Sequence, residues 1–423
     1  MRYIKRVQPS NIKAEFLNDD VIEFDICNNI VDMSSLKIFY DAYIDPVAKY
    51  GTGAYLKRFL PRLSQSIIQE LTVSVNNVPI QQIKEFNLLF NILNDGMKQY
   101  DDIHSDKTDT LLYSYIDDNN VASTRCDFTD NISPAVKEPI VYKYFIDKFI
   151  GFINDVKYLD CRNKNVKISI RLAPKWITHR GIAISNASLT DTYSANYKYR
   201  IRNVYAHIDI LSPDERVPKE DKIVYQDFKY MAGVNGSNKN TYTTIKHTGN
   251  INYILSTFTD ANRETDTGLQ LAKCNADTAT FGTLLLEALS TFSEINSGGL
   301  TKNMASSDYI KILEYENLLN NSLYFKRNGL NIKNCQYRLN GQDITPLMNM
   351  MDIFNLAKDF FGDMKRVQSI HSFQNEFFCF PMKVGELADD MVSEIEWITN
   401  ADNKNANGGT PIMFVCFDKV YQF

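Results

Sequence analysis

Residues 61–100 read PRLSQSIIQELTVSVNNVPIQQIKEFNLLFNILNDGMKQY and predict a strand, a tight turn, a short strand and a helix. Over residues 66–75 the apolar positions recur near a period of two, which is typical of a half-buried strand. The pair Asn76-Asn77 readily adopts the left-handed backbone of a hairpin turn. After a short strand at 78–80, apolar residues return at helical spacing, and they predict one helix face: Ile83, Phe86, Phe90 and Leu93.

The same pattern returns at residues 334–361, NCQYRLNGQDITPLMNMMDIFNLAKDFF. A strand ends in the turn pair Asn340-Gly341, and a short strand runs through Ile344. A helix is predicted next, and its apolar face comprises Leu347, Met350, Met351, Phe354, Ala357 and Phe361. Gly341 lies 264 residues after Asn77. The spacing indicates one structural unit that is built twice.

The parallel continues downstream of both copies. The aromatic run at 377–380 is similar to the run at 149–152, and each precedes a predicted strand, at 393–399 and 166–172 respectively. The chain then ends in residues 411–423, PIMFVCFDKVYQF, a strand pattern that continues to the last residue. An apolar terminus of this kind predicts that the end is built into a sheet or an interface.

The composition favours two domains rich in β-structure. The chain has 423 residues, of which 44% are hydrophobic and 12% aromatic, with 24 Tyr and 25 Phe against two Trp. This length exceeds one ordinary domain, and Tyr and Phe are enriched in strands. Further strands are expected at 21–27, 36–44, 197–211, 221–231 and 250–258, and long loops at 101–137, 233–248 and 259–308.

We therefore predict an all-β protein of two consecutive antiparallel jelly-roll sandwiches, each with a short flanking helix and long rim loops. Residues 1–19 are expected to form an irregular N-terminal arm. The first jelly roll is assigned to residues 20–195 and the second to residues 196–423.

Charge and cysteine content exclude several classes of function. The net charge is −5, and the only basic cluster is Arg2, Lys5 and Arg6, so strong direct binding of nucleic acid is not expected. No stretch approaches the ~18–20 apolar residues of a membrane span, and no signal peptide is present, so we expect a protein that is soluble when made. Seven dispersed cysteines without CxxC spacing indicate reduced thiols: Cys27, Cys126, Cys161, Cys274, Cys335, Cys379 and Cys416.

No catalytic, cofactor-binding or metal site is predicted, and we expect the protein not to be an enzyme. The histidines have no metal-binding spacing: His104, His179, His207, His247 and His371. The acidic pairs Asp101-Asp102 and Asp117-Asp118 lack the glycine of a calcium loop, and residues 51–55 lack the lysine of a phosphate loop. Glu314 and Glu316 have the spacing of strand carboxylates on one face, but no distant partner pair of a glycosidase is identifiable.

Four segments resemble the hexon-like family of double jelly-roll viral major capsid proteins, most closely those of polinton-like viruses, adintoviruses and virophages. They are RFLPRLSQSIIQELTVSVNNVPIQQIKEFNLLFNIL at 58–93, FIGFINDVKYLDCRNKNVKISIRLAP at 149–174, RIRNVYAHIDIL at 200–211 and GTPIMFVCFDKVYQF at 409–423. The resemblance covers most of the chain as an order of elements rather than as a fixed motif. It departs from the family pattern at 233–308, where the strands cannot be placed.

The resemblance implies a structural protein of the virion. In that family three copies form a trimer whose six jelly rolls make a pseudo-hexagonal capsomer, and capsomers tile an icosahedral shell. The implied partners are the chain itself as a homotrimer, neighbouring capsomers, penton and minor capsid proteins, and a host receptor contacted through rim loops such as 101–137 and 233–308. Two alternatives stay open: a capsid protein with one jelly roll and a projecting domain, and a carbohydrate-binding or glycosidase β-sandwich.

Overall fold

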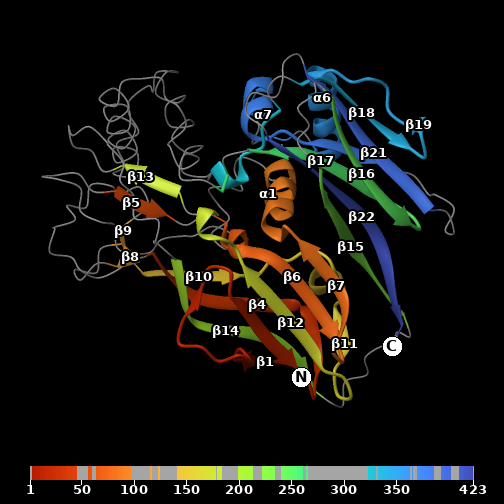
Figure 1. The fold of residues 1–423 in the computed structure, drawn as a ribbon. Coiled ribbons are helices and arrows are strands. Elements are labelled where there is room, and N and C mark those ends of the chain that lie inside the picture. The colour runs from red at the N-terminus through yellow and green to blue at the C-terminus, as the bar shows by residue number, and fades with distance from the viewer. Residues whose placement is uncertain are drawn as a thin grey trace, which may run out of the picture.

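Strands dominate the described residues in both halves of the computed structural model, and every described pair of strands is antiparallel. The described residues are 2–44, 56–59, 63–97, 115–116, 122–123, 141–177, 179–182, 199–212, 222–233, 240–260, 263–264, 323–329, 332–362, 364, 369–384, 392–401 and 409–422. Four main sheets form two sandwiches, which lie side by side (Figure 1).

The first sandwich is built from strands between residues 2 and 211. One sheet has the order β1 (Arg2–Val7), β14 (Tyr199–Leu211), β4 (Ile30–Ile44) and β10 (Val141–Ile146). The facing sheet has the order β3 (Val21–Ile26), β12 (Val166–Leu172), β6 (Ile68–Val75) and β7 (Val78–Lys84). Short strands attach at the margins or pair with each other: β2 (Phe16–Leu17), β5 (Leu56–Phe59), β8 (Tyr115–Ile116), β9 (Ala122–Ser123), β11 (Tyr158–Asp160) and β13 (His179–Ile182).

The second sandwich uses strands between residues 222 and 422. One sheet has the order β15 (Lys222–Ala232), β22 (Thr410–Gln422), β17 (Tyr253–Thr259) and β20 (Phe380–Lys383). The other has the order β16 (Asn240–Thr248), β21 (Val392–Ala401), β18 (Ile332–Leu339) and β19 (Gln342–Asp343).

Both sandwiches have the same topology. When the eight main strands of each are numbered along the chain, one sheet has the order 1-8-3-6 and the other 2-7-4-5. This order, with the first strand beside the last, is that of a jelly roll. The described residues therefore contain two jelly rolls in succession, as predicted, and the alternative of one jelly roll with an unrelated projecting domain is wrong.

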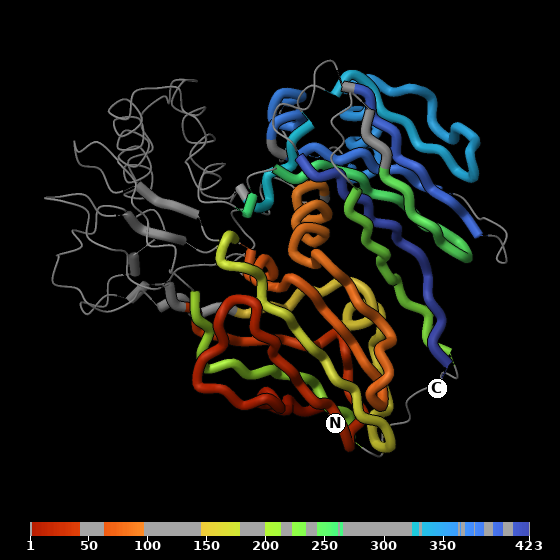
Figure 2. Tube along the Cα trace, in the orientation of Figure 1, coloured from red at the N-terminus to blue at the C-terminus, as the bar shows by residue number. Residues whose placement is uncertain are grey.

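Among the described residues, helices are few and short. The α-helices are α1 (Phe86–Met97), α3 (Phe152–Asp155), α6 (Met350–Phe361) and α7 (Ile370–Glu376), and the 3-10 turns are η1 (Ser64–Ile67), η2 (Lys175–Ile177) and η4 (Leu323–Phe325). Figure 2 shows α1 between the two sandwiches, with the long pair β15 and β22 beside it. The buried apolar side chains of both sandwiches form one continuous cluster.

The duplicated unit is preserved residue by residue. The strands β6 and β18 are both eight residues long, α1 and α6 are both twelve, and each second copy begins 264 residues after the first. Asn76 and Asn77 have φ of 50° and 66°, while Asn340 and Gly341 have φ of 51° and 78°. Both hairpins therefore use the predicted left-handed two-residue turn, because Asn and Gly adopt that region at low cost.

The capping of α6 explains its limits. The Asn349 side chain accepts hydrogen bonds from the backbone N–H groups of Met351 and Asp352, and the Asp352 carboxylate accepts one from the Asn349 backbone N–H. This capping box satisfies N–H groups that the first helical turn leaves unpaired. Gly362 ends the helix in a left-handed conformation, with φ of 79°.

The predicted boundary between residues 195 and 196 is wrong. β14, which was expected to open the second domain, pairs with β1 and β4 and is the last strand of the first jelly roll. The predicted irregular arm at 1–19 is also wrong, since β1 is the first strand of that jelly roll. Every side chain of β1 is at least partly exposed, so it lacks the buried alternation by which a strand is recognised.

Three local predictions also need correction. Part of the loop predicted at 233–248 is β16, a strand rich in Thr that lacks a long apolar run. Ile83 belongs to β7 rather than to the helix, which begins at Phe86. Leu347 and Met351 were placed on the buried face of the second helix, but both side chains are about half exposed, at 53% and 52%.

Several predictions fall on residues that the structure does not describe. These are most of the loops at 101–137 and 259–308, residues 51–55, and Glu314 and Glu316. No described helix is long and apolar enough to cross a membrane.

Candidate functional site

The two jelly rolls contact each other in two regions, which together form the interdomain interface. The strand seam lies where β7 meets β15 and β22, and comprises Ile80, Gln81, Asp155, Tyr225, Gln226, Asp227 and Lys419. The helix clamp surrounds α1 and comprises Gln69, Glu85, Asp95, Arg263, Tyr324 and Arg327. Each region joins residues far apart in the sequence.

At the strand seam, one backbone carbonyl of the first jelly roll is held by two side chains of the second. The Ile80 oxygen accepts hydrogen bonds from the Tyr225 hydroxyl at 2.8 Å and from the Lys419 ammonium at 2.6 Å. Lys419 also pairs with the Asp227 carboxylate at 3.2 Å. Burial raises the pKa of Tyr225, so its hydroxyl keeps the proton that it donates.

Gln81 connects three elements of the same seam. Its amide nitrogen donates to the Gln226 carbonyl at 2.8 Å, and its amide oxygen accepts from the Phe152 backbone at 2.8 Å. The Asp155 carboxylate accepts from the Gln226 backbone, also at 2.8 Å. Gly151 lies against the Gln81 amide in a conformation with φ of 74°. The Gln81 side chain is almost wholly buried, so its hydrogen bonds are not shared with solvent.

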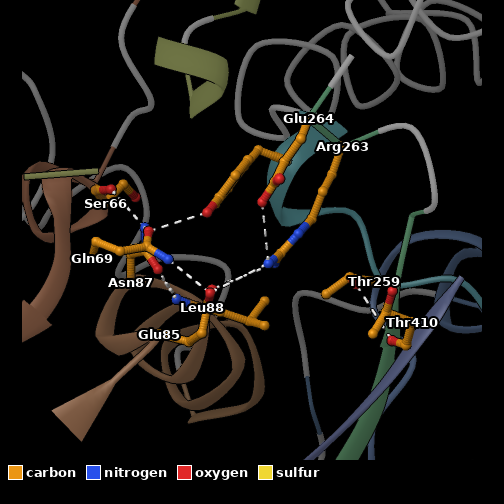
Figure 3. A network of polar contacts seen from close by, with 10 residues as sticks. Ser66, Gln69, Glu85, Asn87, Leu88, Thr259, Arg263, Glu264 and Thr410 are labelled. Atoms are coloured by element: carbon orange, nitrogen blue, oxygen red, sulfur yellow. Dashed lines mark hydrogen bonds and ion pairs between the residues drawn. The ribbon is translucent and has the colours of Figure 1, made fainter. Parts of the chain in front are cut away.

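At the start of α1, the helix clamp is a bidentate ion pair between the two jelly rolls (Figure 3). The two terminal nitrogens of Arg263 lie 3.3 and 3.4 Å from the two carboxylate oxygens of Glu85. Gln69 donates to Glu85 at 2.7 Å and accepts from the Tyr324 hydroxyl at 3.1 Å. Arg263 and Tyr324 belong to the second jelly roll, so each member of the Gln69–Glu85 pair is bound by a residue of that jelly roll.

Glu85 has an unusual backbone conformation, and its carboxylate is largely buried. Its backbone has φ of 52°, in the left-handed region that non-glycine residues rarely adopt. Burial raises the pKa of its carboxyl group, and the neighbouring Arg263 charge lowers it again only in part. A strained backbone and a buried carboxylate persist only where the surrounding structure compensates for them.

Near the end of α1, Arg327 makes the second ion pair of the helix clamp. Its Nη2 lies 2.9 Å from Asp95, and the two side chains are 1% and 6% exposed. The Nε and Nη1 atoms have no hydrogen-bond partner among the described residues. Asp95 lies in the last turn of α1, where the helix dipole disfavours a negative charge, so the arginine compensates for both the burial and the position of this carboxylate.

Apolar contact also joins α1 to the second jelly roll, next to the Asp95–Arg327 pair. A Cβ atom on Gly96 would lie 2.4 Å from the Phe361 ring of α6, so glycine permits close contact between α1 and α6. The described part of α1 from Phe86 to Gly96 is buried at every position. The helix therefore belongs to the core of both jelly rolls, and the interface holds them as one unit.

The described histidines are not brought together into a site. His179 lies on β13, His207 on β14, His247 on β16 and His371 on α7, and no group of three possible metal ligands occurs among the described residues. His104 lies outside the described residues. The interdomain interface thus has the most extensive polar network in the described part of the chain. Its hydrogen bonds and ion pairs attach the two jelly rolls to each other.

We expect the free energy of unfolding to decrease as the pH is lowered, because of His247. This side chain is buried beside the Phe417 ring at 4.2 Å, and burial, together with Lys229, lowers its pKa despite a backbone hydrogen bond to Asn250 and the charge of Asp227. The unfolded chain therefore takes up the proton first. The stability that the neutral His247 side chain contributes is fully present above pH ~6.5 and is lost as the pH falls below it. In that range the free energy of unfolding changes by up to about 1.4 kcal/mol per pH unit.

Urea unfolding at a series of pH values between 7 and 5 measures this decline. The variant His247→Gln should show a flatter profile than the wild type. The matched control is His371→Gln, since His371 is exposed on α7 and contacts Asn375. Equal slopes for the wild type and His247→Gln would show that this histidine does not control the acid sensitivity.

Neither a family model nor a curated protein matches the sequence. Solved structures do match, over nearly the whole chain. A chain of the cryo-EM structure of the Sputnik virophage has a TM-score of 0.56 at 11% identity, and the match covers 99% of this chain and 86% of that one. The PBCV-1 capsid chain matches with a TM-score of 0.52 at 9% identity, with coverages of 99% and 94%. The Faustovirus major capsid protein matches at 0.52 and 8%, with coverages of 100% and 90%.

The chain has the double jelly-roll fold. This confirms the predicted fold class and, at the level of fold, the resemblance to double jelly-roll capsid proteins. The matches span both jelly rolls of each structure, so the likeness extends to their arrangement in one chain.

Sequence reasoning missed the interdomain interface of this double jelly roll. Asp95 and Asp359 occupy the same position of α1 and α6, and only the tertiary structure shows that the first is buried and the second exposed. A signal was nevertheless present. Apart from Asp95 and Gly96, α1 has only apolar or amide residues, on every side of the helix, which is typical of a helix covered all round.

Proposed function

We propose that this chain is the major capsid subunit of an icosahedral virion. The observation that carries the proposal is the full-length match of both jelly rolls to capsid chains, with about nine tenths or more of the PBCV-1 and Faustovirus chains covered. The interdomain interface supports it, because a shell subunit must present its two jelly rolls in a fixed arrangement. Its proposed location is the virion shell.

The proposed assembly is a homotrimer that forms a pseudo-hexagonal capsomer. Two jelly rolls of the same topology in one chain present similar edges twice. Three chains joined head to tail would therefore close a ring of six similar units, and a closed cyclic arrangement is the usual form of a homo-oligomer. Neighbouring capsomers, penton proteins and minor capsid proteins are the further partners that we propose, together with a host receptor contacted by the rim loops.

Assembly of the purified chain tests the proposal. Light scattering should give the mass of a trimer, and electron microscopy should show pseudo-hexagonal particles, arrays or shells. A chain that stays monomeric at all concentrations, salts and pH values would refute the capsid function.

The competing proposal is a glycan-binding or glycan-cleaving sandwich. Binding on a glycan array by a persistently monomeric chain would favour it over the capsid subunit. Loss of that binding in Glu314→Gln or Glu316→Gln would assign the carboxylates, which lie outside the described residues, to the glycan site.

A further inference from the structure

Three basic side chains form a row across the outer surface of the first jelly roll. Arg6 on β1 pairs with His207 on β14, and His207 pairs with Lys37 on β4. The adjacent residues Ala206 and Ile38 are buried, whereas Arg6 and Lys37 are exposed and His207 is partly buried. Because side chains alternate between the two faces of a strand, all three basic side chains lie on the solvent face of the sheet. We call them the basic row.

The members of the basic row lie opposite one another and not opposite acidic partners. Like charges directly opposite each other in a sheet are destabilising. The usual arrangement occurs in the facing sheet, where Lys84 on β7 pairs with Glu70 on β6. Lys37 has no hydrogen bond, ion pair or ring contact with any described residue, and the His207 ring nitrogens have no hydrogen-bond partner among them. The fold therefore brings together donors that it does not itself use.

An aromatic row beside the basic row holds two of its members in place. Tyr205, Phe39 and Phe145 occupy opposed positions on β14, β4 and β10. The Cζ atom of Arg6 lies 3.9 Å from the centre of the Tyr205 ring, and the His207 ring lies 4.8 Å from the Phe39 ring. An arginine stacked on a ring keeps N–H groups in the guanidinium plane for another acceptor. Side chains fixed in this way lose less entropy when an anion binds.

The surroundings of the basic row limit the size of its ligand. Neighbouring strands are about 4.8 Å apart, so a row across three strands spans roughly 10 Å. Asp209 lies two residues along β14 from His207, on the same face. Asp147 directly follows β10, next to the strand position of Lys37. These two carboxylates repel a long polyanion that continues past the row, whereas a compact anion with two or three charged groups fits between them.

The second jelly roll shows that the strand seam leaves this part of the sheet open. Gln226 and Asp418 are the counterparts of Arg6 and His207, because each pair joins the fifth residue of the first strand to the fifth-last residue of the last strand. The Gln226 backbone belongs to the strand seam, yet the Asp418 side chain is exposed. A basic row at this place therefore stays accessible when β1 takes part in a contact of the same kind. Neither counterpart is basic, so the row is a feature of the first jelly roll.

We propose that the basic row binds a small polyphosphate anion, either inorganic triphosphate or the triphosphate group of a nucleotide. The Arg6 guanidinium matches the geometry of phosphate oxygens, Lys37 supplies a compact positive charge, and His207 supplies a ring N–H donor. The bound anion neutralises the charges that oppose one another across β1, β14 and β4, and so it stabilises the first jelly roll. This site goes beyond the proposed capsid function and does not depend on it.

Thermal unfolding and titration calorimetry of the purified full-length chain test the site. Sodium triphosphate should raise the melting temperature more than sodium sulfate does at equal ionic strength, because a ligand that binds only the folded state stabilises it. Lys37→Gln and, separately, Arg6→Gln should each weaken triphosphate binding at least about fivefold. Without ligand, Lys37→Gln should melt at or above the temperature of the wild type, since it removes one of the opposed charges.

The matched control is Lys84→Gln. It removes an exposed strand lysine that lies opposite Glu70, and it should bind triphosphate as the wild type does. Equal triphosphate affinities of the wild type and Lys37→Gln would overturn the inference. A lower melting temperature of unliganded Lys37→Gln would also overturn it, because the lysine would then serve the fold and not a ligand.

Two further ligands identify the source of the phosphates. Equal affinities for adenosine triphosphate and inorganic triphosphate would support recognition of the phosphates alone, and tighter binding of adenosine triphosphate would support a nucleotide. A single-stranded oligonucleotide that binds where triphosphate does not would contradict a compact ligand and overturn the inference. A chain that assembles into capsomers but binds no triphosphate would lose this site and keep the capsid function.

Discussion

Replacing Asp95 by alanine should lower the free energy of unfolding by about 3–5 kcal/mol, because the substitution leaves the Arg327 guanidinium buried without its carboxylate. The pair lies at 2.9 Å in an almost wholly buried site. Breaking a buried ion pair costs more than the pair contributes, since the remaining charge cannot regain its hydration. Urea unfolding of the dissociated chain measures the loss.

The duplication supplies the control. Asp359→Ala removes a carboxylate from the same helix position of α6, where the side chain is exposed. It should change the free energy of unfolding of the dissociated chain by less than about 0.5 kcal/mol. Equal losses in the two variants would mean that the cost comes from the helix itself and not from the interdomain ion pair.

Replacing Gly151 by alanine should cost on the order of 3–5 kcal/mol. Gly151 has φ of 74° and ψ of −144°, a region open almost only to glycine, and forcing alanine into it costs about 1–3 kcal/mol. A Cβ atom would also lie 2.4 Å from the Gln81 amide nitrogen. Displacing Gln81 then disturbs its bonds to Phe152 and Gln226, which adds about 1–3 kcal/mol because a buried group is left unpaired.

Gly341→Ala separates the two causes. Gly341 also has positive φ, at 78°, but no atom lies within 4 Å of the position that its Cβ would take. The expected loss is therefore the backbone cost alone, roughly 1–2 kcal/mol. If thermal or urea unfolding shows the two glycine variants to be equally destabilised, the contact with Gln81 does not hold the jelly rolls together.

The elements predicted well from the sequence are those that local contacts determine. The hairpin turns at Asn76-Asn77 and Asn340-Gly341 depend on the φ preferences of those residues alone, and β12 follows from strict alternation of Val166, Ile168 and Ile170. Their repetition at a constant spacing revealed the duplication. The fold class followed from these units and from the family resemblance.

The elements that were misplaced depend on long-range pairing. β14 carries the same alternating pattern whether it ends one domain or begins the next, and only its pairing with β4 decides between them. β1 was missed because an edge strand with exposed side chains has no apolar pattern. The interdomain ion pairs were missed for a related reason: burial of Glu85 and Asp95 comes from the second jelly roll, more than 160 residues away in sequence.

The pairing of the first strand of each jelly roll with its last affects how the chain folds during synthesis. β1 forms its sheet with β14, whose residues follow about 200 positions later. At typical rates of 5–20 residues per second, the ribosome needs roughly 10–40 s to supply that partner. The first jelly roll cannot close before then, and non-local closure of this kind is intrinsically slow. Because residues of the second jelly roll, such as Arg327 and Phe361, cover part of α1, that part of its surface stays exposed longer still, and nascent chains are most prone to aggregate in this interval.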